Sequence, residues 1–149
     1  MREILFKAKR IDNGEWVEGY LFDNGFDGEE KKYFVGGLVI EKYNGTACDE
    51  WDITGIDFCE IDPETLCQFT GETDKNGKRI WESDVVWLVY DGKEHIYQIV
   101  WDNSELDFKA TNGEENYGSN FEYLLCCDEI EVIGNIFDNP ELLQEESNE

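Results

Sequence analysis

Short apolar runs separated by turn-forming residues dominate the chain, and this pattern predicts strands rather than helices. In the first half, Asp12-Asn13-Gly14 lies between two such runs and is typical of a tight hairpin turn. Gly36-Gly37 interrupts a later run, and Asp62-Pro63-Glu64-Thr65 predicts a turn or a single helical turn with Asp62 as its N-cap. Residues 44–54 show no clear pattern. The strands expected here cover residues 4–11, 16–22, 32–35, 38–41 and 56–61.

The second half has a clearer pattern. Asp91-Gly92 is a strong hairpin signal between two apolar runs. Gly134 interrupts the last run, which predicts a bulge or a close approach of the backbone there. Asn139, Pro140 and Glu141 are the residue types expected at the start of a short helix. The strands expected here cover residues 85–90, 95–101, 106–110 and 131–137, with a short helix or strand at 121–125.

Many short strands with almost no amphipathic helix predict a mainly β protein. The second half holds about five strand-length segments, which suits a small SH3-like barrel. We place a boundary near residues 70–77. The expected organisation is an N-terminal β subdomain at 1–70, a candidate for oligomerisation, and an SH3-like barrel with a short C-terminal helix at 71–149.

Three blocks of the sequence carry long motifs. The first is the opening Arg2-Glu3-Ile4-Leu5-Phe6-Lys7-Ala8. The second is the segment 61–86, which contains Asp62-Pro63-Glu64-Thr65 and Asp74-Lys75-Asn76-Gly77, and the third is residues 132–143. All three blocks resemble the YopX family of phage and prophage proteins, whose patterns include DPETxxQ(Y/F)TGxxDKNGKxIYEGDIV for the second block and VIGNIYENPELL for the third. Ser83 stands where the family usually has glycine, and Glu72 where leucine is common.

The resemblance implies a mostly β homo-oligomer with an SH3-like barrel, encoded by a phage or prophage and acting in the bacterial cytoplasm. It supplies no activity that could be transferred. We interpret the motif positions as structural because turns, strand entries and bulges account for their residue types. Asn76 and Gly77 suit positive φ, and Asp84 can accept hydrogen bonds from backbone amides at a strand entry. The positions are Gly71, Asp74, Lys75, Asn76, Gly77, Asp84, Gly134, Asn135 and Pro140.

The charge of the chain changes the range of possible partners. Its 149 residues include 36 acidic and 12 basic side chains, a formal net charge of -24. This charge excludes direct binding to nucleic acid or to an anionic membrane surface as the default function. Disorder is excluded by the apolar content of 40% and the aromatic content of 14%. No stretch approaches the roughly 20 apolar residues of a membrane span, and we expect a cytoplasmic protein.

The cysteines are odd in number and show no CxxC spacing, so we expect small core residues rather than disulfides or zinc ligands. Adjacent Cys126 and Cys127 would point to opposite faces of a strand. The five cysteines of the chain are Cys48, Cys59, Cys67, Cys126 and Cys127.

Enzymatic chemistry finds little support in the sequence. No nucleophile elbow, P-loop or zinc-protease motif is present, and the single histidine, His95, is expected at the surface or rim of a strand. Asp23-Asn24-Gly25-Phe26-Asp27-Gly28 resembles a calcium loop but has glycine at the third position and Phe34 at the twelfth. We therefore expect no catalytic residue, no metal and no cofactor.

The charge is unevenly distributed along the chain. Residues 1–10 carry four basic side chains against one acidic, whereas eleven acidic and no basic residues follow position 109. The basic first strand could pack against an acidic neighbour, within a subunit or between subunits, and high salt would then loosen the assembly.

Two functions remain open. One is a non-catalytic phage accessory protein that forms a homo-oligomer or contacts a host protein. The alternative is an acidic DNA mimic that inhibits a host DNA-binding or defence protein.

Overall fold

A computed structural model of the chain describes residues 2–42, 51–112 and 121–143. The chain separates into two compact units. The N-terminal unit is Ile4–Leu66, and the C-terminal unit joins Met1–Glu3 to Cys67–Glu149. The sequence-based boundary, between residues 70 and 71, lies a few residues further along. Glu3 forms an ion pair with Arg79 of its own unit, at 3.1 Å between Oε1 and Nη2.

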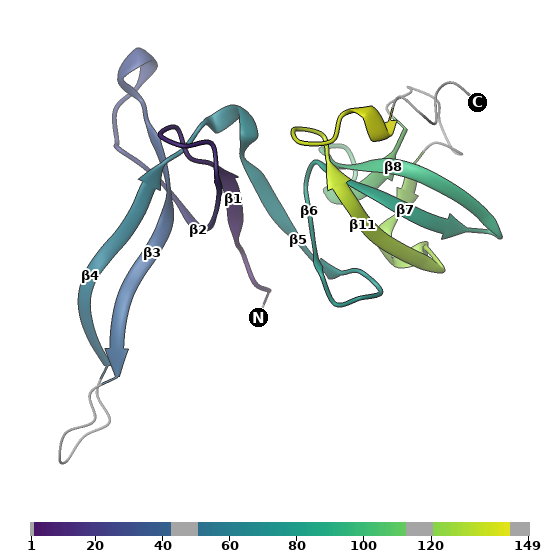
Figure 1. Ribbon diagram of the computed structural model, residues 1–149, viewed down its shortest axis with the longest axis horizontal. Coiled ribbons are helices and arrows are strands. Elements are labelled where there is room, and N and C mark those ends of the chain that lie inside the picture. The colour runs from purple at the N-terminus through teal and green to yellow at the C-terminus, as the bar shows by residue number, and fades with distance from the viewer. Residues whose placement is uncertain (1, 43–50, 113–120, 144–149) are drawn as a thin grey trace. The chain divides into compact units, whose positions relative to one another are not determined.

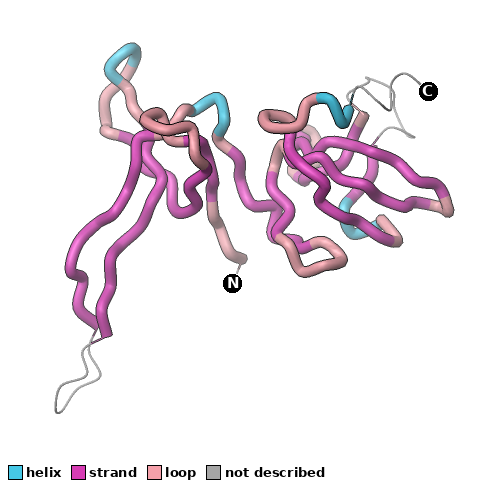
Figure 2. The backbone as a smooth tube through the Cα atoms, in the orientation of Figure 1, coloured by secondary structure: helices cyan, strands magenta, loops and turns pink. Residues whose placement is uncertain are grey.

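The N-terminal unit contains an antiparallel arrangement of four strands in the order β4-β3-β2-β1 (Figures 1 and 2). The turn predicted at Asp12-Asn13-Gly14 is confirmed, with Gly14 at φ 72°. The N-cap prediction is also confirmed, because Asp62 Oδ1 accepts a hydrogen bond from the Glu64 backbone N–H at 3.0 Å. The elements are β1 (Phe6–Lys9), β2 (Trp16–Asp23), the 3-10 turn Gly28–Glu30, β3 (Tyr33–Lys42), β4 (Trp51–Glu60) and the 3-10 turn Pro63–Thr65.

The predicted break at Gly36-Gly37 is wrong, because β3 runs through both glycines. Glycine is required at position 36 by a close approach of β4. A Cβ atom there would lie 2.1 Å from the Asp57 carbonyl oxygen and 2.4 Å from Phe58 Cβ. Gly36 therefore lets two strands meet and does not end one. β4 also begins five residues earlier than expected, at Trp51. Residues 44–50 of the unpatterned stretch lie outside the described residues.

The core of the N-terminal unit is small and lies on one face of the sheet. Ala8, Val35 and Ile61 are fully buried there. Side chains alternate between the two faces of a strand, so the residues that flank Val35 along β3 point to the other face. The partly buried residues packed against this core are Val17, Leu21, Tyr33 and Leu66.

The C-terminal unit contains a five-stranded antiparallel sheet in the order β10-β9-β8-β7-β11, and a separate pair formed by β5 and β6. The hairpin predicted at Asp91-Gly92 is confirmed by the β7–β8 register, in which Tyr90 lies opposite Lys93. The strands β5 and β6 were not predicted. The elements are β5 (Cys67–Thr73), β6 (Arg79–Trp81), β7 (Asp84–Tyr90), β8 (Lys93–Asp102), β9 (Asp107–Thr111), β10 (Phe121–Tyr123), the 3-10 turn Leu124–Cys126 and β11 (Glu129–Asn135).

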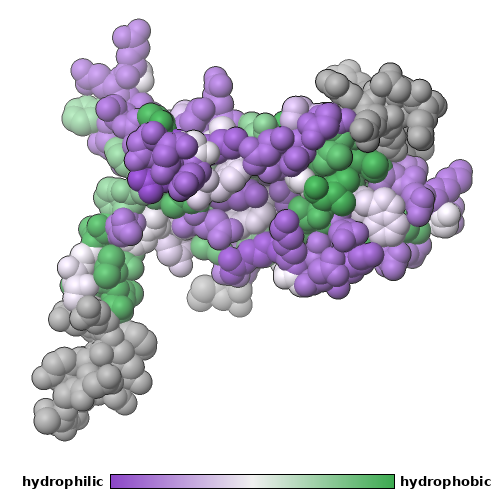
Figure 3. Space-filling model, viewed as in Figure 1, coloured by the Kyte–Doolittle hydropathy of each residue, from purple (hydrophilic) through white to green (hydrophobic). Residues whose placement is uncertain are grey.

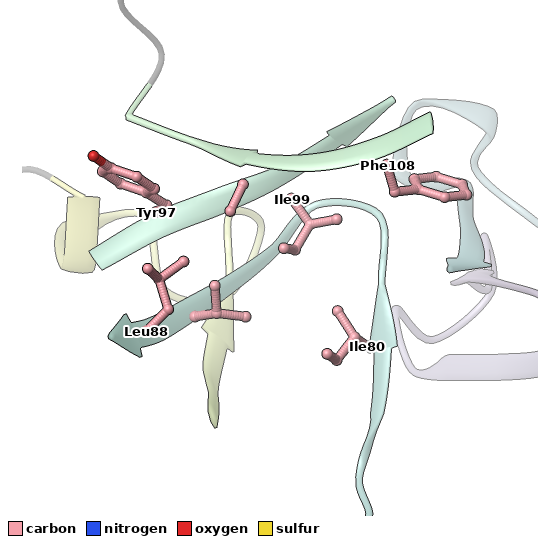
Figure 4. Packing of buried hydrophobic residues seen from close by; sticks show 7 residues of the cluster. Ile80, Leu88, Tyr97, Ile99 and Phe108 are labelled. Atoms are coloured by element: carbon pink, nitrogen blue, oxygen red, sulfur yellow. The ribbon is translucent and has the colours of Figure 1, made fainter. Parts of the chain in front are cut away.

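Alternating side chains of three neighbouring strands build the core of the C-terminal unit. Leu88 of β7, Ile99 of β8 and Phe108 of β9 point to one side of the sheet, and Ile80 of β6 joins them (Figure 4). The fully or almost fully buried members are Ile80, Val86, Leu88, Tyr97, Ile99, Phe108 and Ala110.

The sheet of the C-terminal unit stays open at both edges. The predicted SH3-like barrel is not confirmed: in the described residues β10 and β11 are the two edges of the sheet, and no sheet closes. Cys126 ends a 3-10 turn and Cys127 follows it, so the two do not alternate along a strand as expected. Residues 141–143 are helical, as predicted. No helix in the described parts of the chain is long and apolar enough to cross a membrane.

Ser83 holds an unfavourable backbone conformation between β6 and β7. Its φ is 72°, a region that costs an L-residue about 1–2 kcal/mol. Two backbone hydrogen bonds hold the turn: Ser83 N–H donates to the Ile99 carbonyl at 2.8 Å, and Ile136 N–H donates to the Ser83 carbonyl at 3.0 Å. The turn thus links β8 to the segment that follows β11.

Replacing this residue should release the strain. We expect Ser83→Gly to raise the free energy of unfolding by roughly 0.5–1 kcal/mol, because glycine adopts this φ freely but loses more backbone entropy on folding. Urea denaturation would measure the change, with Ser83→Ala as the control that keeps a Cβ atom. Equal stability of the glycine and alanine variants would contradict the strain argument.

Candidate interaction surface

The sheet of the N-terminal unit exposes a set of large apolar side chains on the side opposite its core. Figure 3 shows hydrophobic residues along the hairpin of β3 and β4. We call this set the apolar face. Its seven members are each between 42% and 61% exposed: Tyr20, Phe22, Leu38, Ile40, Ile53, Ile56 and Phe58.

The strand register places these residues on a common surface. Leu38 lies opposite Ile56, and Ile40 lies opposite Ile53 after a bulge that shifts the pairing of β3 with β4. On the other side of β3, Tyr20 lies opposite Gly36. Residues directly opposite in an antiparallel pair share a face and have Cβ atoms about 4.5–5.5 Å apart. The apolar face is therefore continuous across β2, β3 and β4.

An aromatic cluster anchors one end of the apolar face. The ring of Phe58 lies 5.7 Å from the ring of Phe22 and 5.7 Å from that of Phe34, measured between centroids. Gly36, which lies opposite Phe58, presents no side chain between these rings. A shallow hollow is lined here by residues that include Tyr20, Gly36, Leu38 and Phe58. The face thus combines projecting rings with a recess.

The charged side chains that border the apolar face are three lysines and two glutamates. The register places Lys7 directly opposite Glu18, and Lys9 opposite Trp16. The ammonium groups of both lysines lie over the Trp16 ring, at 4.8 and 5.5 Å from its centroid. The basic first strand therefore has an acidic residue opposite it within the same unit. Glu60, which lies opposite Phe34, forms an ion pair with Lys32 at 3.4 Å.

Asp74 joins two of the sequence blocks that were singled out above. Its Oδ1 accepts hydrogen bonds from the backbone N–H groups of Asn76 and Lys78, both at 2.9 Å, and its Oδ2 accepts one from Val132 at 3.0 Å. Burial of the carboxyl opposes ionisation, but the three N–H donors outweigh it and lower the pKa of Asp74. The carboxylate thus fixes the loop after β5 to β11.

The rest of that loop strengthens the same junction. Lys75 N–H donates to the Ile130 carbonyl at 3.0 Å, and the Lys75 ammonium lies 3.7 Å from a Glu131 carboxylate oxygen and over the Trp87 ring. Asn76 Nδ2 donates to Glu131 at 3.3 Å. Gly71 and Gly77 adopt positive φ of 91° and 81°, whereas Asn76, contrary to expectation, does not. One residue with positive φ is enough for this turn.

The remaining motif positions lie around the entry of β7 and the end of β11. Asp84 is buried and accepts a hydrogen bond from Trp81 N–H at 2.8 Å, as expected for a strand entry. The bulge expected at Gly134 is confirmed by the register shift from Val132 to Gly134. Asn135 Oδ1 accepts from two backbone N–H groups in the following turn, and the exposed Pro140 precedes the helical residues 141–143.

A separate ionic cluster surrounds Lys109, whose side chain is only 6% exposed. Its ammonium lies 2.8 Å from Asp102 and 3.1 Å from Glu105, and Glu105 also accepts a hydrogen bond from the Tyr123 hydroxyl. The bond to Asp102 raises the pKa of Lys109, and the pKa of Asp102 is lowered by Lys109 and Ser104. An ammonium held this firmly in its protonated form is unsuited to nucleophilic or base catalysis.

The histidine, the calcium-like loop and the cysteines do not come together in one site among the described residues. His95 is half-buried at the rim of the core and stacks on Tyr97 with 4.9 Å between centroids. In the described residues no group of three or more potential ligands could hold a metal ion, and Asp23 instead accepts a hydrogen bond from Gly25 N–H. Of the described cysteines only Cys67 is fully buried, while Cys126 is exposed. Cys48 lies outside the described residues.

The apolar face was not identified from the sequence. A usable signal was present, because β3 carries apolar residues at successive positions, Leu38-Val39-Ile40, where a half-exposed strand would alternate apolar and polar. The sequence pattern instead predicts an ordinary strand at 38–41 and a break at the two glycines before it.

The chain is similar to proteins that are already known. It matches the family described as YopX protein over residues 6–144. The crystal structure of protein EF1440 from Enterococcus faecalis is similar, with a TM-score of 0.53 and 22% sequence identity, over 96% of this chain and 99% of that chain. At this identity the likeness concerns the fold alone. No curated protein matches the chain.

The Asp74 junction leads to a prediction about stability. Asp74→Asn should lower the free energy of unfolding at pH 7 by roughly 2–3 kcal/mol, because the charge is lost and an amide N–H₂ meets a backbone N–H donor. The pKa of Asp74 is lowered on folding, so its contribution is complete above the unfolded pKa of about 4 and is lost as the pH falls from there through the lower pKa of the folded state. The two proteins should therefore converge toward pH 3.

Denaturation curves at several pH values would measure this convergence. Glu94→Gln removes one charge from an exposed position of the same unit and is the matched control. A gap between wild type and Asp74→Asn that persists unchanged at pH 3 would contradict the proposed role of the carboxylate.

The apolar face leads to a second prediction. Ile56→Thr should leave the free energy of unfolding within about 0.5 kcal/mol of wild type, because Ile56 is 61% exposed and threonine suits a strand. The same change should reduce binding of the apolar dye ANS, measured by fluorescence. Leu125→Thr, at an exposed position of the C-terminal unit, should leave dye binding unchanged; an equal loss with both variants would show that the dye does not report this face.

Proposed function

This chain belongs to the YopX family, and we propose that it is a non-catalytic accessory protein of a phage or prophage. In this proposal it acts in the bacterial cytoplasm through protein–protein contacts, and the apolar face is its contact surface.

One observation carries the proposal: the N-terminal sheet is apolar on both faces. Antiparallel sheets commonly bury one face and expose a polar one. Here the buried face holds Ala8, Val35 and Ile61, and the other still presents seven large apolar side chains. Exposed apolar surfaces larger than a few hundred Å² mark interaction sites in soluble proteins. A binding surface explains why these positions are apolar.

The titratable groups favour the same conclusion. Those with the most displaced pKa values, Lys109 and Asp102, form an ion pair with each other. Asp74 is bound by backbone amides. These groups stabilise the fold through an ion pair and backbone hydrogen bonds, and this structural role accounts for their displaced pKa values without a role in proton transfer.

Affinity capture from a bacterial lysate tests the proposal, with tagged wild type, Ile56→Asp and Leu125→Asp compared side by side. The two variants carry the same chemical change at exposed positions of different units. We expect specific proteins to be retained by wild type and Leu125→Asp and lost with Ile56→Asp. An identical set on all three would contradict the assignment of the surface.

The same experiment separates the alternative. A DNA mimic with a net charge of -24 would retain DNA-binding proteins that high salt releases, because that contact is electrostatic. Its captured proteins would be unaffected by Ile56→Asp.

A further inference from the structure

We infer that the outer edge of β4, the side away from β3, binds an extended segment of a partner protein in which apolar and basic residues alternate. The segment adds a strand to the N-terminal sheet. This inference rests on the proposed function, and names the binding mode and the chemistry of the partner at the apolar face.

The outer edge of β4 offers backbone hydrogen-bonding groups. β4 is the end strand of its sheet (Figure 1). Ile61 N–H donates to the Tyr33 carbonyl at 3.0 Å, and in an antiparallel strand the backbone groups of successive residues point alternately to its two sides. Those of Glu60 and Phe58 therefore point outward. Ile11 N–H already donates to the Glu60 carbonyl at 3.1 Å, and a hollow that Ile11 and Phe58 help to line lies beside this contact.

The next part of the edge lacks the features that commonly block strand addition. Lysine, proline and bulges protect many edge strands of natural proteins. From Gly55 to Glu60, β4 contains no lysine and no proline, and the bulge in its pairing with β3 lies before Gly55. No strand pairs with this side of β4 among the described residues. The outward backbone groups of Ile56 and Phe58 thus form a short, regular template.

The side chains of β4 determine which residues an added strand should carry. Ile56 and Phe58 lie on the apolar face and are 61% and 44% exposed. Asp57, between them, points to the opposite face and is also exposed. An added strand places its own side chains next to these. Apolar residues beside Ile56 and Phe58, alternating with basic residues near Asp57, are the matching pattern.

The charge favours a basic partner over a second copy of β4. This strand contains three acidic residues and no basic one, so two copies side by side would bring like charges together. The N-terminal unit has 6 basic and 15 acidic residues, a net charge of -9. The same charges attract a basic segment.

Fluorescence anisotropy of labelled peptides, titrated with the full chain in 0.1 M NaCl, tests the side-chain pattern. The first peptide has seven residues in which lysine and valine alternate. The second has the same residues with its valines consecutive, so it keeps the charge and loses the pattern. We expect the second to bind about tenfold more weakly or worse, because it cannot present its apolar side chains to one face.

Backbone methylation of the first peptide tests strand pairing. In an antiparallel added strand, the residues opposite Ile56 and Phe58 share the apolar face and direct their N–H groups at β4. These residues are the valines. Methylating the valine nitrogens should weaken binding by about tenfold, whereas methylating the lysine nitrogens should change it by less than about twofold. The reverse order would show that the added strand is parallel.

Reversing one charge tests the partner chemistry. Asp57→Lys should weaken the lysine–valine peptide by about tenfold and strengthen a glutamate–valine peptide, because like and opposite charges exchange places beside β4. Glu94→Lys makes the same change at an exposed position of the C-terminal unit and should alter both affinities by less than about twofold. Thermal unfolding checks that each variant is folded.

Three results would overturn the inference: equal affinity of the patterned and rearranged peptides, equal affinity of the two methylated peptides, or equal effects of Asp57→Lys and Glu94→Lys. Competition between the peptide and a dimer of the chain, measured by sedimentation equilibrium, would assign the edge to a second copy and overturn it as well. In each case the proposed function stands if lysate capture still depends on Ile56. Peptide binding as expected, with capture unaffected by Ile56→Asp, would support the added strand and contradict the proposed function.

Discussion

A small antiparallel sheet has two faces. When the rest of the unit packs against one face, the other face stays exposed. This constraint governs the N-terminal unit, whose fully buried core is limited to Ala8, Val35 and Ile61. On the opposite face, Gly36 allows β4 to approach β3 closely, and Phe58 lies near Phe22 and Phe34. The surface that we assign to binding is thus a direct result of how these strands meet.

In the C-terminal unit, two polar residues attach loops to the sheet. Asp74 fixes the loop after β5 to Val132, and Ser83 connects Ile99 with Ile136. These contacts bring together the two longest sequence blocks of the family resemblance, which lie more than 50 residues apart at Asp74 and Val132. The motif residues seen here therefore have architectural contacts, while the apolar face lies outside the two longer blocks.

Local chemistry was predictable from the sequence, and long-range pairing was not. The turns at Asp12-Asn13-Gly14 and Asp91-Gly92 and the cap at Asp62 were foreseen because neighbouring residues determine them. The continuity of β3 was missed, since the need for glycine at position 36 comes from packing against β4, some twenty residues away in the sequence. The apolar face was missed for the same reason: which side of a strand is covered depends on the register of its partners and on the core behind it. The strands β5 and β6 were missed because β5 alternates apolar and polar residues only from Cys67 to Thr70, and β6 is only three residues long.

The discontinuous make-up of the C-terminal unit has a consequence for biosynthesis. The chain leaves that unit after Glu3 and returns at Cys67, so the N-terminal unit is an insertion within it. All residues of the inserted unit, Ile4–Leu66, emerge from the ribosome before Cys67. The ion pair of Glu3 can form only after Arg79 has been synthesised. Domains generally fold as units during synthesis, N-terminal first. The inserted sheet can therefore present its apolar face on a nascent chain, before the more acidic unit has been made.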